Sequence, residues 1–152
     1  MAGIKYRGRS VILAISAAVQ TGSGIYLLTS DQYLKLSGNS LHWDALLTFC
    51  VVDAVLLVSL LAGKGVLQKI AAGVWSAVGA AAILGDAASN LALSSFHTSA
   101  PYAGWKYLFG FGRVSGSGSV FGTSVAVTAI LIFCVISIMA AIHSARQSGR
   151  SA

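Results

Sequence analysis

Two aspartates lie inside long apolar stretches, where a charge is costly. Asp53 lies within FCVVDAVLLVSLLAGK, from Phe49 to Lys64, and Asp86 lies within the apolar run that ends near Leu93. If these runs cross a membrane, each carboxyl is expected to face the interior of a helix bundle, a cavity or a partner. Two such carboxyls could hold a hydrogen-bond network, bind a cation or carry a proton.

The composition predicts an integral membrane protein formed by one domain, residues 1–152. Hydrophobic residues make up 56% of the chain and charged residues only 9%, whereas a soluble domain usually has about a quarter charged residues. The mean hydropathy is +0.80. The net charge of +6 comes from residues at the ends of apolar runs. We therefore interpret it as a signal of membrane orientation, with the lipid bilayer and not nucleic acid as the surrounding partner.

Four apolar runs reach the roughly 20 residues that a spanning helix needs. The first also resembles a secretory signal peptide, but we interpret it as a span. The expected spans are about 10–29, 43–63, 66–93 and 119–142. The sequence thus predicts an all-α, four-helix transmembrane bundle. Seven Lys and Arg residues lie on one side of these spans and three on the other, which predicts that both termini are cytoplasmic. Trp75 is expected near the cytoplasmic boundary.

Counting along the spans predicts a polar layer near the middle of the bilayer. Asp53 lies about ten residues from the outer end of its span, or about 15 Å, and Asp86 is expected at a similar depth. The predicted layer contains Gln20, Asp53, Asp86, Asn90 and Thr128. No basic residue is expected at that depth, so at least one of the two carboxyls is expected to be protonated at neutral pH.

Three interpretations of the two aspartates stay open. In the first, neutral carboxyls hydrogen-bond to Gln20, Asn90 or each other and lock the bundle. In the second, a basic residue or a cofactor of another subunit neutralises them. In the third, they form a path for protons or cations.

Rows of small residues at four-residue spacing predict close contacts between helices, because small side chains let backbones approach in lipid. We expect packing within the bundle, and the alternative is contact with another protein. The rows are Ala14, Ala18 and Gly22 in the first span; Gly73, Ala77, Ala81, Gly85 and Ser89 in the third; and Gly122 and Ala126 in the fourth.

No motif predicts a catalytic, metal or cofactor site. The chain has no glutamate, and no Ser, His and Asp meet at one depth. His42, Asp44 and His97 are expected at the outer face, where three solvated residues are more common than a metal site. Cys50 and Cys134 are expected to be buried as small apolar side chains and not to form a disulfide.

Two segments, FCVVDAVLLVSLLAG (49–63) and GTSVAVTAILIFCVISIMAAIHSAR (122–146), resemble the second and fourth spans of plant Casparian-strip membrane-protein-like chains. The four-span plan is similar to that of MARVEL-type proteins in general. The chain departs from that family because it has no arginine well inside the first span and because Asp86 comes late in the third. The resemblance implies a scaffold that self-associates and recruits partners.

Together these patterns favour a non-enzymatic structural or accessory subunit, or a scaffold, that works through helix contacts with other membrane subunits or with itself. The alternative is a small proton- or cation-coupled transporter or channel that uses Asp53 and Asp86.

Overall fold

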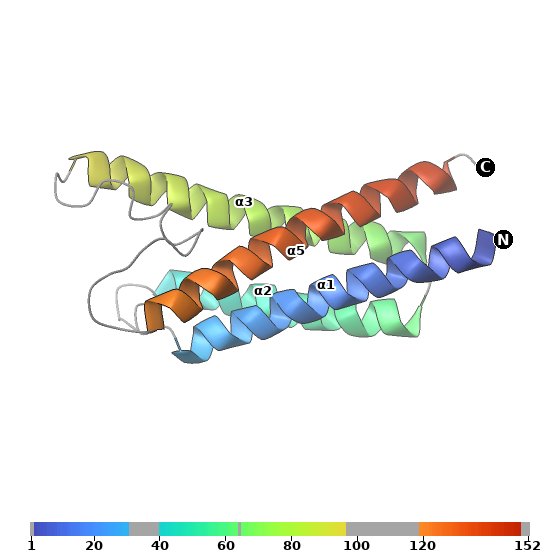
Figure 1. Ribbon diagram of the computed structural model, residues 1–152, viewed down its shortest axis with the longest axis horizontal. Helices are drawn as coiled ribbons and strands as arrows, with labels where there is room; N and C mark the ends of the chain where they lie inside the picture. The colour runs from blue at the N-terminus through green and yellow to red at the C-terminus, as the bar shows by residue number, and fades with distance from the viewer. Residues whose placement is uncertain (1, 31–39, 64, 97–118, 150–152) are drawn as a thin grey trace.

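The computed structural model describes residues 2–30, 40–63, 65–96 and 119–149, with side chains at 8–30, 43–63, 65–85 and 125–149. Four long helices make up nearly all of this described part: α1 (Ala2–Ser30), α2 (Ser40–Ala62), α3 (Val66–Phe96) and α5 (Ser119–Ser148) (Figure 1). Each contains a stretch long and apolar enough to cross a membrane: Gly8–Ser30, Trp43–Ala62, Val66–Gly85 and Val125–Ser148. The prediction of an all-helical chain with four apolar helices is confirmed, and it indicates a membrane protein.

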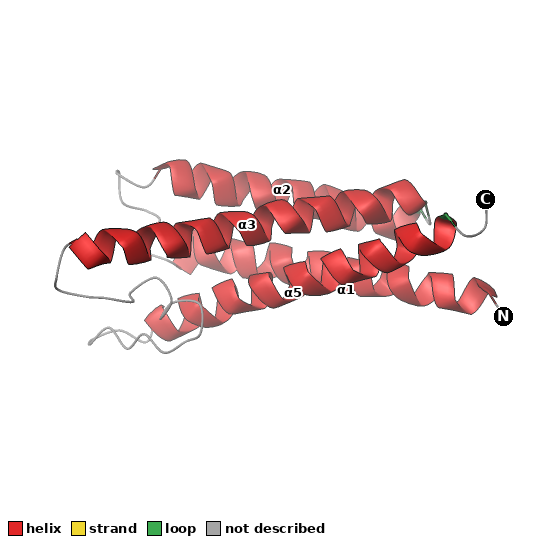
Figure 2. Ribbon diagram, turned by 90° about the horizontal axis from the view of Figure 1, so that it is seen from above, coloured by secondary structure: helices red, strands yellow, loops and turns green. Residues whose placement is uncertain are grey.

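The helices form an elongated bundle in which α1 begins and α5 ends at the same end (Figures 1 and 2). We call this the terminal end, and the opposite end, where α1 ends and α5 begins, the loop end. The turn between α2 and α3 also lies at the terminal end, because α2 runs back from the loop end. That the terminal end faces the cytoplasm stays a prediction from the charge bias.

The α2–α3 turn is tight because glycines flank it. The Gly63 amide donates to the Ser59 carbonyl at 2.9 Å, which completes the last turn of α2. The Gly65 amide donates to Oε1 of Gln68 at 3.0 Å, so a side chain of α3 satisfies one of the amides that a helix start leaves open. A Cβ at Gly63 would lie 2.6 Å from the Gln68 amide nitrogen.

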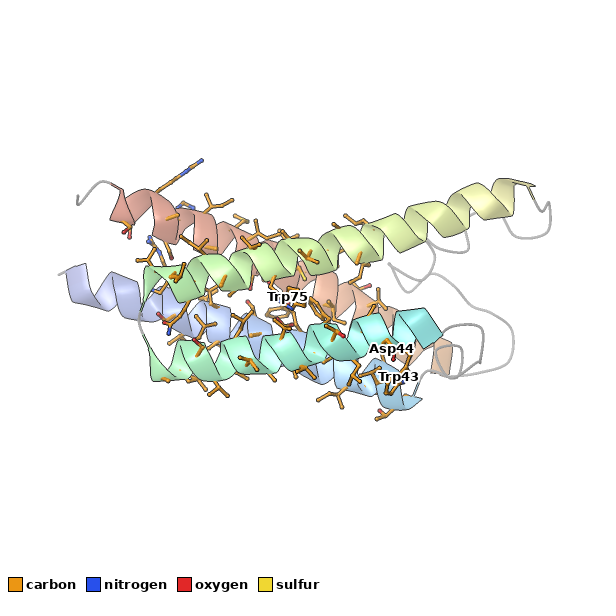
Figure 3. The ribbon with its side chains drawn as sticks, turned by 180° about the vertical axis from the view of Figure 1, so that it is seen from behind. Trp43, Asp44 and Trp75 are labelled. Carbon is orange, nitrogen blue, oxygen red and sulfur yellow. The ribbon has the colours of Figure 1, made fainter. Side chains whose placement is uncertain are left out.

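Around the bundle, α1 packs against α2 and α5, and α3 packs mainly against α5, whereas α2 and α3 meet along a shorter seam. The rings of Phe49 and Trp75 stack across this seam with centroids 5.9 Å apart. The Trp75 indole donates to the Phe49 carbonyl at 3.3 Å. Trp75 therefore lies between α2 and α3 near the middle of the bundle (Figure 3), and its expected place at the membrane boundary is wrong.

Glycines bring the helices close at three points. A Cβ at Gly73 would come within 3.0 Å of the Ala141 Cβ on α5. Cβ atoms at Gly24 and Gly79 would collide with the Cys50 thiol and the Phe49 ring in the same way. Of these glycines only Gly73 belongs to an expected small-residue row.

Most members of the expected rows face outward. Ala14 and Ala126 are buried, but the members that face outward are Ala18, Gly22, Ala77, Ala81 and Gly85. A four-residue step turns about 40° beyond one full helical turn, so such a row winds away from a fixed contact. The side chains of Ser89 and Gly122 lie outside the described residues.

The interior contains two apolar clusters. The cluster toward the terminal end contains Leu13, Ala14, Leu60, Ala72 and Ala140. The cluster toward the loop end contains Leu27, Phe49, Ala80, Ala126, Ile130 and Cys134.

Candidate functional site

A layer of polar side chains lies between the two apolar clusters, with one member from each helix; its α5 member, Cys134, also belongs to the cluster toward the loop end. Its members are Gln20 of α1, Asp53 of α2, Ser76 of α3 and Cys134 of α5. Each polar residue lies a few positions along its helix from residues of the apolar clusters. Ser76, for example, lies between Ala72 of one cluster and Ala80 of the other. The exposed fraction of each of these four side chains is 2% or less. We call this set the polar layer.

Gln20 links three of the four helices. Its Nε2 lies 3.3 Å and its Oε1 3.4 Å from the Ser76 hydroxyl, and the Cys134 thiol lies 3.6 Å from Oε1. Such hydrogen bonds between membrane helices contribute about 0.6 kcal/mol each on average. The partner of the Ser76 hydroxyl is an amide, which is not a base, so this contact holds the helices together without activating a nucleophile.

Asp53 brings α2 into the polar layer, but its carboxyl is incompletely bonded. The side chain is 2% exposed, and its buried Oδ2 has no hydrogen-bond partner among the described residues. The carboxyl interacts electrostatically with the thiols of Cys50 and Cys134. A basic residue of another protein cannot reach so enclosed a carboxyl in this conformation, so the geometry favours the interpretations in which Asp53 acts within the chain.

Two other buried hydroxyls bond to their own helix. The Ser16 hydroxyl donates to the Ile12 carbonyl at 2.9 Å, and the Ser144 hydroxyl donates to the Ala140 carbonyl at 2.8 Å. A serine can be accommodated in this way without a partner on another helix. Gln20 differs from these serines because it connects helices.

The structure separates several residues that the sequence placed at one depth. Asp86 lies ten residues beyond Ser76 on α3, which is about 15 Å closer to the loop end, and Asn90 lies farther still. Their side chains are outside the described residues. Thr128 is half-buried and lies about 9 Å from the level of Cys134, again toward the loop end. Of the expected layer, Gln20 and Asp53 both interact with Cys134, and Ser76 and Cys134 complete the layer.

A buried lysine is the main feature that the sequence interpretation missed. Lys69 is one of the seven basic residues that the charge bias assigns to the cytoplasmic side of the spans, yet its side chain is only 1% exposed. The positive charge of Arg9 acts on its ammonium group. The signal for burial was present, because Lys69 precedes Ala72, Gly73 and Ser76 at the spacing of one helix face.

Among the side chains that the structure describes, no three His, Cys, Asp or Glu residues come together as metal ligands would. Asp44 is exposed at the start of α2 (Figure 3), and the side chains of His42 and His97 lie outside the described residues. Cys50 and Cys134 are buried free thiols, as expected.

Comparisons with protein-family models, with curated proteins and with solved structures found no match.

Proposed function

We propose that this chain is a non-enzymatic four-span membrane protein that acts as an accessory subunit or scaffold of a membrane assembly. The observation that carries the proposal is the enclosure of the polar layer. Gln20 is 0% exposed and bonds to Ser76 and Cys134, so its polar groups connect helices and do not meet a substrate. The hydrogen bonds of this layer hold the helices together.

The outer face of α3 supports contact with another membrane helix. Ala77, Ala81 and Gly85 are exposed on it, and a Cβ at Gly85 would meet nothing within 4 Å. Exposed small residues also occur on α1, at Ala18 and Gly22, but the row on α3 is longer. Exposed positions on the other two helices include larger side chains, such as Val58 on α2 and Met139 on α5. Because small residues favour close helix approach in lipid, α3 is the helix on which we expect a partner.

Photo-crosslinking in the native membrane tests this contact. A photoreactive residue at Ala81 should give a discrete adduct with a protein, which can be a second copy of the chain. The control is Val135, an exposed residue of α5, where only lipid adducts are expected. The proposal fails if Ala81 gives only lipid adducts, or if both positions give the same protein adducts.

We propose proton or cation transport as the second candidate, because the Oδ2 atom of Asp53 is enclosed without a hydrogen-bond partner among the described residues. A buried carboxyl of this kind is a common element of proton relays in membranes. Flux into proteoliposomes should then be lost in Asp53→Asn and kept in Asp44→Asn, which removes an exposed carboxyl. If the purified protein gives no flux and Asp53→Asn still folds, the structural interpretation of Asp53 stands.

The MARVEL-type resemblance implies the same class of function, a self-associating scaffold, and stays a prediction. Cytoplasmic placement of both termini is likewise part of the proposal, and it rests on the distribution of Lys and Arg.

A further inference from the structure

A groove of about 310 Å³ lies between α1 and α5 at the terminal end of the bundle. Its lining changes from basic to apolar along its length. Its lining residues are Arg9, Ile12, Ile136, Met139, Ala140 and His143. Because α1 and α5 run antiparallel, Arg9 and His143 form the rim nearest the terminal end, and Ile136 lies about 10 Å deeper toward the middle of the bundle.

The rim carries positive charge that acidic side chains do not balance. The Arg9 guanidinium donates to the His143 carbonyl at 3.4 Å and to Oε1 of Gln147, and both acceptors are uncharged. Lys69 lies close enough for its charge to act against that of Arg9. The described segments contain three acidic residues, at positions 44, 53 and 86, and none of them belongs to the parts of the helices that form this end of the bundle.

We propose that this groove binds an anionic phospholipid. The phosphate would lie beside Arg9, and an acyl chain would follow Ile12, Met139 and Ile136 toward the middle of the membrane. The gradient from charge at the rim to apolar side chains below it matches the order of groups in a phospholipid. A basic residue near the membrane surface attracts anionic lipids.

Lipid retention measured by native mass spectrometry tests the charged part of the site. Phosphatidylglycerol and phosphatidylcholine with the same acyl chains are added in equal amounts. The wild-type protein should retain phosphatidylglycerol preferentially, and Arg9→Gln should reduce that preference about fivefold, which corresponds to one basic residue near an anionic surface. The matched control is Arg146→Gln, because Arg146 is an exposed arginine of α5 that does not line the groove.

A second pair of variants tests the apolar part and does not depend on the Arg9 hydrogen bonds. Met139 is 57% exposed, so Met139→Trp can fill the groove without disturbing the core, and it should lower retention of both lipids. Ile132→Trp is the control, since Ile132 is 52% exposed on the same helix and does not line the groove. Excess glycerol phosphate should not displace the bound lipid, because it lacks the acyl chain.

Any one of the following results would overturn the proposal. The first is equal retention of the two lipids by the wild-type protein. The second is an equal loss in Arg9→Gln and Arg146→Gln, which would indicate a diffuse basic surface. The third is full lipid retention by Met139→Trp or full displacement by glycerol phosphate, since either would exclude a bound acyl chain.

Discussion

Replacing Gly73 by alanine should destabilise the bundle, whereas the same replacement at Gly85 should not. A Cβ at Gly73 would come within 3.0 Å of the Ala141 Cβ and 3.7 Å from the Ser137 carbonyl oxygen. Ala141 has no flexible side chain that could move aside, so α3 and α5 must separate. Forcing an extra methyl group into a packed interface costs about 1–3 kcal/mol.

Gly85→Ala is a matched control on the same helix. Its Cβ would meet nothing within 4 Å, and alanine favours a helix over glycine by about 1 kcal/mol. Because both variants share this gain in propensity, the difference between them isolates the steric cost at the α3–α5 contact. We therefore expect Gly73→Ala to unfold more easily than Gly85→Ala by about 1–3 kcal/mol.

The assay is reversible unfolding of the three proteins in bicelles, followed by circular dichroism during titration with a denaturing detergent. Helix content before titration shows whether each variant starts folded. Equal unfolding midpoints for Gly73→Ala and Gly85→Ala would contradict the close packing of α3 on α5 and with it the arrangement of the bundle.

Three further predictions concern the interior. Gln20→Leu and Ser76→Ala should each lower the free energy of unfolding by about 0.5–2 kcal/mol. The double variant should lower it by less than the sum of the two effects, because both replacements remove the same contact. The same unfolding titration measures these free energies. Cys50 and Cys134 are buried, so N-ethylmaleimide should label them only after denaturation, as mass spectrometry will show. Trp75→Phe should cost about 0.5–1.5 kcal/mol for the lost hydrogen bond, and Trp75→Ala about 3–5 kcal/mol in the same assay.

The four apolar helices could be predicted from the sequence because length and hydropathy alone determine whether a segment can cross a membrane. Asp53 and Gln20 could be predicted as buried for the same reason, since a polar group inside a span avoids lipid. Their neighbours could not be predicted by counting from span ends, because α3 extends to Phe96. Counting inward from that distant end of the third span places Asp86, instead of Ser76, at the depth of Asp53.

The direction in which each helix faces was harder to predict. The outer face of each helix is as apolar as its inner face, as the exposed side chains of Leu61 and Leu67 show. Hydrophobic periodicity therefore gives little information about which face points into the bundle. The four-residue rows therefore suggested contacts at Ala77 and Ala81 that face outward, whereas Gly24 and Gly79 make close contacts inside. The α3 residues that face inward are Lys69, Ala72, Gly73 and Ser76. Both Ala72 and Gly73 lie three or four residues from Lys69 and from Ser76, which is the spacing of one helix face.

The native mass of the protein, extracted gently from its own membrane, tests the central claim most directly. An accessory subunit or scaffold should migrate well above the 15.6 kDa of one chain. Ala81→Leu should reduce the native mass to that of a single chain. Val78→Leu, at a neighbouring exposed position, should leave the assembly intact. A wild-type protein that is already a single chain in gentle extraction would contradict the claim that it works through contacts with other membrane helices.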